Sequence, residues 1–193
     1  LSSSSAASDV YKRQRLNWRE VAVLRAYACY MKQTMFNFSQ TYIANTLANH
    51  LGITRNLVAL FKSTFDPRVN QGDAKDLERI ERLGNKIIES LDHVDNLNED
   101  RIIRRYLDFI QGTLRTNFFQ PDKDGNSKSY ISFKFNPQSI ADIPEPRPLY
   151  EIFVYSPRME GVHLRGGSVA RGGLRWSDPV SYTHLRAHET DSY

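Results

Sequence analysis

Three arginines and two Gly-Gly pairs stand close together between residues 160 and 178. Glycine has no Cβ, so each pair lets the backbone turn tightly and bring its N–H groups close to a ligand. Arginine adds a planar, permanently charged group that binds two carboxylate or phosphate oxygens at once. The run therefore predicts a loop that binds a small anion.

This run and the segment 150–159 before it resemble the start of the catalytic region of the large bacterial NAD-specific glutamate dehydrogenases. Three upstream pieces resemble the same family in the same order, namely residues 114–120 (LRTNFFQ), 130–135 (YISFKF) and 143–148 (IPEPRP). Because several pieces agree in order, the resemblance is more specific than a single motif. It covers roughly residues 15 to 178.

The resemblance implies an enzyme that deaminates L-glutamate oxidatively to 2-oxoglutarate and ammonia, with NAD as cofactor, in a homo-oligomer. In the smaller members of the superfamily, a Lys-Gly-Gly-Leu/Ile-Arg motif places its lysine on the side-chain carboxylate of the substrate. Residues 171–175 (RGGLR) resemble this motif with arginine in place of lysine. The resemblance therefore implies Arg171, Gly172 and Gly173 as substrate-binding residues. A guanidinium that holds the distal carboxylate would also orient the Cα hydrogen towards the nicotinamide ring.

Other residues of the run receive no catalytic role. No substrate atom is assigned to Arg165 or Arg175, and pairing with an acidic neighbour is the alternative for Arg171. His163 is expected to be a hydrogen-bonded strand histidine rather than a general base, and Trp176 to be a core residue. The family's catalytic lysine and dinucleotide domain would come after this run, and no Gly-x-Gly-x-x-Gly follows a strand. The fragment alone is therefore expected to be inactive.

The two ends of the chain do not continue the family pattern. Residues 1–14 are rich in Ser and Ala, and residues 179–193 replace the arginine and acidic residues that the family would carry there. Both segments are interpreted as foreign, adapter-like sequence, with a natural tail at each end as the alternative. His184 and His188 have a spacing that could serve a metal on a helix, but no third ligand converges with them. No metal site is predicted.

The composition is that of a globular protein. The 193 residues are 40% hydrophobic and 11% aromatic, and the net charge is +4. This charge is spread along the chain, so it does not by itself indicate nucleic acid or anionic lipid as a partner. The single cysteine, Cys29, excludes an internal disulfide, and no apolar run is long enough to span a membrane. A cytoplasmic protein without membrane association is expected.

The hydrophobic period changes from 3.6 to 2 residues near Gly112. Before this point the periodicity predicts five helices, over residues 17–35, 39–51, 54–65, 73–94 and 98–111. Asn17 with Glu20 is a start signal for the first helix, Gly52 is expected to end the second, and Thr54 to cap the third. One apolar stripe of the 73–94 helix is expected to begin at Leu77.

After Gly112 the pattern predicts strands. Residues 113–120 and 129–135 are expected to pair as an antiparallel hairpin, and residues 149–155 to form a further strand. The predicted fold class is therefore α+β. A helical non-catalytic region, residues 15–112, precedes the first strands of an α/β glutamate dehydrogenase substrate domain, residues 113–178.

Two patterns would also suit a nucleic-acid-binding protein. Residues 47–58 fit the helix-turn-helix spacing with Gly52 in the turn, and the Arg-Gly-Gly units at 165–167 and 171–173 resemble RNA-binding tracts. The would-be recognition face carries few cations, and the Arg-Gly-Gly units lie among apolar residues that suit a packed sheet. Nucleic-acid binding is therefore kept only as an alternative.

The helical part allows a third interpretation. Its helices present wide apolar stripes, which would suit a regulatory or assembly module as well as an internal core. The sequence alone does not separate a core within one chain from a contact between subunits.

Overall fold

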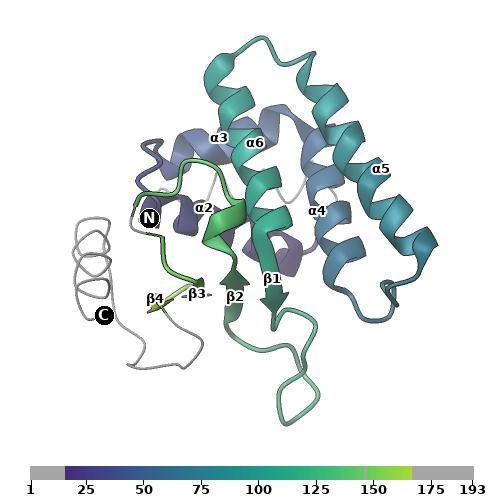
Figure 1. Ribbon diagram of the computed structural model, residues 1–193, viewed down its shortest axis with the longest axis vertical. Helices are drawn as coiled ribbons and strands as arrows, with labels where there is room; N and C mark the ends of the chain where they lie inside the picture. Colours follow the sequence, from purple (N-terminus) through teal and green to yellow (C-terminus); the bar gives the residue numbers. More distant parts are fainter. Residues whose placement is uncertain (1–15, 146, 167–193) are drawn as a thin grey trace. The chain divides into compact units, whose positions relative to one another are not determined.

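The computed structural model describes residues 16–145 and 147–166. In this part of the chain five α-helices come first and four β-strands follow (Figure 1). The helices are α2 (Trp18–Gln33), α3 (Gln40–Asn49), α4 (Leu51–Phe65), α5 (Ala74–Leu91) and α6 (Leu97–Gly112). The strands are β1 (Thr113–Thr116), β2 (Ile131–Phe135), β3 (Tyr150–Ser156) and β4 (Met159–Arg165), with a 3-10 turn, η1 (Pro137–Ser139), between β2 and β3. The predicted α+β arrangement is confirmed.

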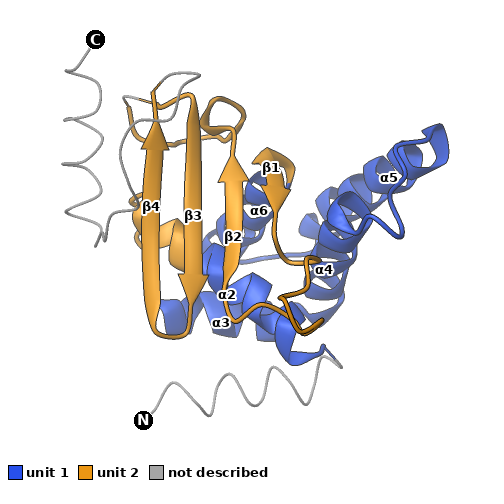
Figure 2. Cartoon of the chain, turned by 90° about the horizontal axis from the view of Figure 1, so that it is seen from below, with its two compact units in different colours: residues 1–28, 38–110 blue, residues 29–37, 111–193 orange. Residues whose placement is uncertain are grey.

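The chain divides into two compact units, which Figure 2 draws in different colours. The helical unit comprises residues 1–28 and 38–110, and the sheet unit comprises residues 29–37 and 111–193. The first boundary falls inside α2, so the last residues of this helix belong with the strands. The last boundary falls at the end of α6, next to the start of β1.

Helix α2 begins with a reciprocal pair of hydrogen bonds between side chains and backbone. Asn17 N donates to Glu20 Oε2 (2.8 Å), and Glu20 N donates to Asn17 Oδ1 (2.9 Å). Two amide groups at a helix start, which no helical carbonyl can reach, are thereby satisfied. The predicted start signal is confirmed. Glu20 also accepts a hydrogen bond from Lys62 Nζ of α4 (3.1 Å).

Aromatic side chains form the centre of the helical unit. Tyr27 of α2 is fully buried. Its ring centroid lies 6.2 Å from that of Phe61 in α4 and 6.5 Å from that of Tyr106 in α6. Both pairs are edge-to-face, a geometry that stabilises beyond the burial of apolar area. The Tyr106 hydroxyl donates to Leu24 O (3.0 Å), so this buried polar group is satisfied.

The junction between α3 and α4 corrects two predictions. His50 alone separates the two helices, and Gly52 and Thr54 both lie inside α4. Gly52 therefore does not end a helix, and Thr54 does not cap one. The buried Thr54 hydroxyl donates to Leu47 O of α3 (2.8 Å) and so joins the two helices. Gly52 is the second residue of α4, whereas the helix preference that disfavours glycine by about 1 kcal/mol applies to the interior of a helix.

Helix α5 buries less of its predicted apolar stripe than expected. Ile87 and Leu91 are buried, but Leu77, at the expected start of the stripe, is 61% exposed. The exposed side carries the expected ion pair, with Arg82 Nε 3.7 Å from Glu78 Oε1. The buried apolar stripe therefore occupies only the second half of this helix.

The four strands form one antiparallel sheet in the order β1-β2-β3-β4 (Figure 2). The predicted hairpin between residues 113–120 and 129–135 is confirmed, although β1 already ends at Thr116. Strand β4 corrects the prediction of a loop from residue 160 onwards, although His163 is expected in a strand. Its alternating buried residues, Val162 and Leu164, stand among glycines and arginines that hide the strand pattern.

One side of the sheet is packed and apolar, and we call it the inner side. Successive side chains of a strand point to opposite sides, so residues in register share a side. The buried residues of the inner side are Ile131, Phe133, Phe135, Phe153, Val162 and Leu164. The ring of Tyr30, near the end of α2, stacks on that of Phe135 with centroids 4.1 Å apart and an interplanar angle of 7°.

Both acidic residues of the strands lie on the inner side and contact the end of α2. Glu151 is fully buried and accepts a hydrogen bond from the Tyr30 hydroxyl (2.6 Å). Glu160 accepts one from Gln33 Nε2 (3.4 Å). A carboxyl group removed from water is costly unless polar groups replace its hydration. The Tyr30 hydroxyl therefore stabilises Glu151 and fixes the helix end against the sheet.

Gly112 joins α6 to β1 in a space that has no room for a larger residue. An added Cβ would lie 2.4 Å from Ile140 Cγ1 and 2.8 Å from Ile140 Cδ1. The Gly112 carbonyl accepts a hydrogen bond from Asn136 N (2.9 Å), which ties the junction to the end of β2. Steric exclusion, rather than backbone conformation, requires glycine here.

We expect Gly112→Ala to destabilise the sheet unit by about 1–3 kcal/mol, because the new methyl group overlaps the Ile140 side chain. Hydrogen exchange of the β1 and β2 amides in the complete protein measures this loss. The double variant Gly112→Ala/Ile140→Ala should lose less than the sum of the two single variants, since the added methyl occupies vacated space. Strict additivity would contradict the steric explanation.

We expect Tyr30→Phe to destabilise the sheet unit by about 1.5–3 kcal/mol, because the buried Glu151 carboxyl loses the hydrogen bond from the Tyr30 hydroxyl while the ring stack is kept. Exchange of the β3 amides reports the loss. Tyr106→Phe is the matched control, since it removes a buried hydroxyl that donates to a neutral carbonyl, and it should cost only about 1 kcal/mol. Equal losses in the two variants would contradict a special role for Glu151.

Candidate functional site

The outer side of the sheet carries a row of basic residues. Arg115 of β1 pairs directly with Lys134 of β2. Lys134 pairs with Ile152 of β3. Arg165, the last residue of β4, stands opposite Tyr150 of β3 on the same side. We call Arg115, Lys134 and Arg165 the cationic face.

Lys134 is the central member of the cationic face. Its Nζ lies 3.6 Å from the ring centroid of Tyr150, close enough for attraction between the ammonium and the face of the ring. Burial, and then the positive charges of Arg165 and Arg115, hold the pKa of the Lys134 ammonium below its usual value. Like charges on neighbouring strands repel each other, so this arrangement is unfavourable as it stands.

No acidic residue of the four strands shares the outer side, because Glu151 and Glu160 both lie on the inner side. In the part of the chain that the structure describes, neither Lys134 nor Arg115 forms an ion pair with a carboxylate. An arginine and a lysine held side by side in this way produce a positive potential that attracts anions. The arrangement is chemically suited to bind a carboxylate or a phosphate.

The predicted substrate-binding residues Arg171, Gly172 and Gly173 lie outside the described residues. The same holds for Arg175, Trp176, His184 and His188. The structure does describe the start of the arginine and glycine run. His163 is a half-buried residue of β4, so its expected strand position is confirmed. Arg165 ends the same strand, six residues before Arg171.

Sequence reasoning missed Arg115 and Lys134. The alternation that predicts β2 already places Lys134 on the side opposite to Phe133 and Phe135, so the sequence did contain a signal for its orientation. Arg115 could not be placed in this way. The register between β1 and β2 shifts between Thr113 and Arg115, and only this irregularity brings Arg115 beside Lys134.

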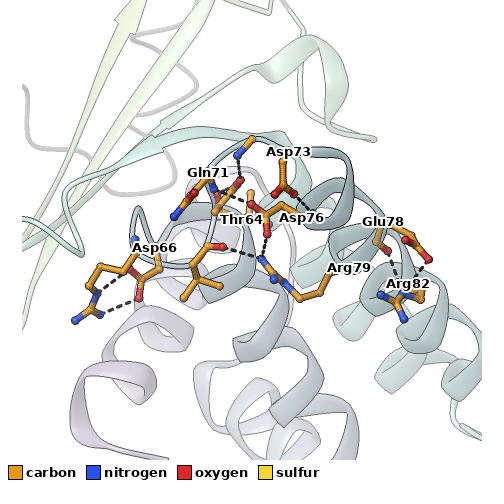
Figure 3. Close-up of polar contacts among 12 residues, drawn as sticks. Thr64, Asp66, Gln71, Asp73, Asp76, Glu78, Arg79 and Arg82 are labelled. Atoms are coloured by element: carbon orange, nitrogen blue, oxygen red, sulfur yellow. Dashed lines mark hydrogen bonds and ion pairs between the residues drawn. The ribbon is translucent and has the colours of Figure 1, made fainter.

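A second polar cluster lies in the connection between α4 and α5 and in the first turns of α5 (Figure 3). Asp66 Oδ1 accepts hydrogen bonds from Arg68 N and Nε, and Asp66 Oδ2 accepts one from Arg68 Nη2. The Asp76 carboxylate accepts hydrogen bonds from Gln71 N (2.7 Å) and from Arg79 Nη2 (2.6 Å).

These bonds lower the pKa of both carboxyl groups. The hydrogen bond from the Arg68 side chain is the main cause for Asp66, and the hydrogen bond from the Gln71 backbone is the main cause for Asp76. Each carboxylate thus accepts hydrogen bonds from a backbone amide of the connection and from an arginine side chain. We interpret this cluster as a means of ordering the α4–α5 connection rather than as a ligand site.

The described residues offer little support for other kinds of site. Among residues 16–145 and 147–166, no group of three or more His, Cys, Asp or Glu side chains is arranged to hold a metal ion. None of the described helices combines the length and hydrophobicity that crossing a bilayer requires. The helix-turn-helix alternative needs Gly52 in a turn, but this residue is helical. Arg165, which begins one Arg-Gly-Gly unit, belongs to a paired strand.

Two family models match the chain. Residues 86–184 match the bacterial NAD-glutamate dehydrogenase catalytic domain, and residues 10–67 match glutamate dehydrogenase helical motif 3. The first match contains all four strands and the whole cationic face.

Curated relatives agree with these matches. The chain is 56% identical to an NAD-specific glutamate dehydrogenase of Pseudomonas aeruginosa, over 91% of this chain and 11% of that protein. It is 52% identical to an NAD-specific glutamate dehydrogenase of Halomonas elongata, over 90% of this chain and 11% of that protein. It is 44% identical to an NAD-specific glutamate dehydrogenase of Mycobacterium tuberculosis, over 89% of this chain and 10% of that protein.

The chain thus spans about a tenth of the length of the curated relatives that it matches. Within that span the similarity includes both the helices and the strands, since the two family matches begin at residue 10 and end at residue 184. The chain belongs to the family of bacterial NAD-glutamate dehydrogenases.

Proposed function

We propose that the complete protein is an NAD-dependent glutamate dehydrogenase, which converts L-glutamate to 2-oxoglutarate and ammonia. The match of residues 86–184 to the catalytic domain of that family carries the proposal. The descriptions of the relatives as NAD-specific glutamate dehydrogenases support it. This chain would supply one part of the substrate site.

Within this chain we assign the distal carboxylate of glutamate to Arg171. Gly172 and Gly173 would let the backbone approach the ligand, because neither residue has a Cβ. Strand β4 supports this assignment, since it is paired with β3 up to Arg165, six residues before Arg171. A charged hydrogen bond of this kind contributes about 1.5–3 kcal/mol, and holding the substrate in one orientation lowers the barrier further.

NAD would accept the hydride that leaves the glutamate Cα. The described residues do not fit a dinucleotide. A Rossmann site needs a parallel strand that leads through a glycine-rich turn into the N-terminus of a helix. The four described strands are antiparallel, and none of them leads through such a turn into an α-helix. We therefore assign NAD binding to residues other than those that the structure describes.

We expect the isolated 193-residue chain to be inactive, because it spans only about a tenth of its relatives and its described part does not fit the dinucleotide. The measurement is the reduction of NAD in the presence of L-glutamate, followed by absorbance, with circular dichroism to verify that the chain is folded. A rate of NAD reduction above that without protein would contradict the assignment of NAD binding to residues other than the described ones.

We expect Arg171→Ala in the complete enzyme to raise the KM for glutamate and for 2-oxoglutarate by about 10- to 150-fold, which corresponds to the loss of one charged hydrogen bond. The KM for NAD should stay within about twofold, since the arginine is assigned to the amino acid alone. Steady-state kinetics with each substrate varied in turn gives both values.

Arg158→Ala is the matched control for this experiment. Arg158 is an exposed arginine in the turn between β3 and β4, and its removal should leave all KM values unchanged. Equal effects of Arg171→Ala on the amino acid and on NAD would reject the role assigned to Arg171.

A further inference from the structure

The cationic face has no role in the proposed function, which assigns the substrate carboxylate to Arg171. Arg115 and Lys134 are direct neighbours on adjacent strands, and Arg165 is close enough to lower the pKa of Lys134. Backbone pairing holds these residues in place, so they cannot separate without breaking the sheet. Like charges gathered in this way become favourable when an anion binds between them.

The surroundings of Lys134 indicate what kind of anion fits. Ile152 stands directly opposite Lys134 on β3, and Val154 lies two residues further along on the same side. Both are only half-buried, and the Tyr150 ring lies against the Lys134 ammonium. The outer side therefore combines positive charge with apolar surface. An organic acid can place its carboxylate on the cations and its carbon chain on the apolar residues, which inorganic phosphate cannot do.

We propose that the outer side of the sheet binds a small organic carboxylate, with Lys134 as its principal cation and Arg115 and Arg165 on either side. The cationic face is a site of its own, additional to Arg171, and its residues belong to paired strands. Tyr150 holds the Lys134 ammonium in place, and Ile152 contacts the carbon chain of the ligand.

The experiment measures the reactivity of Lys134 in the complete protein, with 2-oxoglutarate as the probe. A bound carboxylate raises the pKa of a neighbouring ammonium, so less neutral amine is present to react. A rise of about one pKa unit lowers the labelling rate about tenfold. Trace acetylation with acetic anhydride, followed by mass spectrometry of the peptides, reports this rate for each lysine separately.

Lys128 is the matched control. It is a lysine of the same unit whose Nζ also lies near a tyrosine ring, 6.0 Å from the centroid of Tyr130, and it donates to Gln120 Oε1 (3.2 Å). Saturating 2-oxoglutarate should slow the labelling of Lys134 about tenfold and leave that of Lys128 unchanged. Unchanged labelling of Lys134 would overturn the proposal. Equal protection by inorganic phosphate would overturn the assignment to a carboxylate.

Two variants provide an independent measurement of binding, made in the Arg171→Ala protein so that the assigned substrate site does not contribute. Lys134→Gln in this protein should weaken the binding of 2-oxoglutarate about tenfold, and Lys134→Arg should restore most of the affinity because it keeps the charge. Unchanged affinity of the Lys134→Gln variant, measured by isothermal titration calorimetry, would contradict the proposal.

The labelling experiment also separates this inference from the proposed function, from which it takes only the choice of probe. Binding is observed without turnover. Protection of Lys134 that persists in the Arg171→Ala protein would show that the cationic face binds the carboxylate by itself. If 2-oxoglutarate protects Lys134 from labelling but the complete protein does not deaminate glutamate, the proposed binding site is supported and the proposed reaction is rejected.

Discussion

The buried contact between Tyr30 and Glu151 is the interaction on which the sheet unit depends. A carboxyl group without access to water must be matched by polar partners, and the Tyr30 hydroxyl is one of these at 2.6 Å. The same side chain stacks its ring on Phe135, so a single residue satisfies a polar group and contributes to the apolar core. Glu151 cannot move to the outer side of the sheet without breaking this contact. Because side chains alternate along a strand, the position of Glu151 determines on which side of the sheet each residue of β3 lies.

This contact keeps the acidic residues of the strands on the side of the sheet opposite to Lys134. With Glu151 and Glu160 on the inner side, the outer side of the four described strands carries no carboxylate. A shift of β3 by one residue would exchange its two sides and bring Glu151 next to Lys134. The acid would then neutralise the lysine, and the positive potential of the outer side would fall. A tyrosine that lies far from β3 in the sequence thus preserves the electrostatic character of the opposite side.

Much of the secondary structure could be predicted from the sequence because local signals determine it. The Asn17–Glu20 pair marks the start of α2, and alternating apolar residues mark β2. The errors occur where tertiary packing overrides local preference. Gly52 is helical because a single residue separates α4 from α3, in a junction held by the hydrogen bond from Thr54 to Leu47, and β4 is a strand because β3 pairs with it along its whole length. The site was harder to predict, since Arg115 and Lys134 meet only through a strand register that no short motif encodes.

The boundary inside α2 means that the sheet unit is assembled from two stretches that are distant in the sequence. A gene fragment that starts at Thr113 would encode all four strands but neither Tyr30 nor Gln33. Its product would leave Glu151 without the tyrosine hydroxyl and the Phe135 ring without its stacking partner. Expression of the strands alone therefore invites aggregation, whereas adding a peptide with residues 29–37 in trans offers a route to complementation of the split protein.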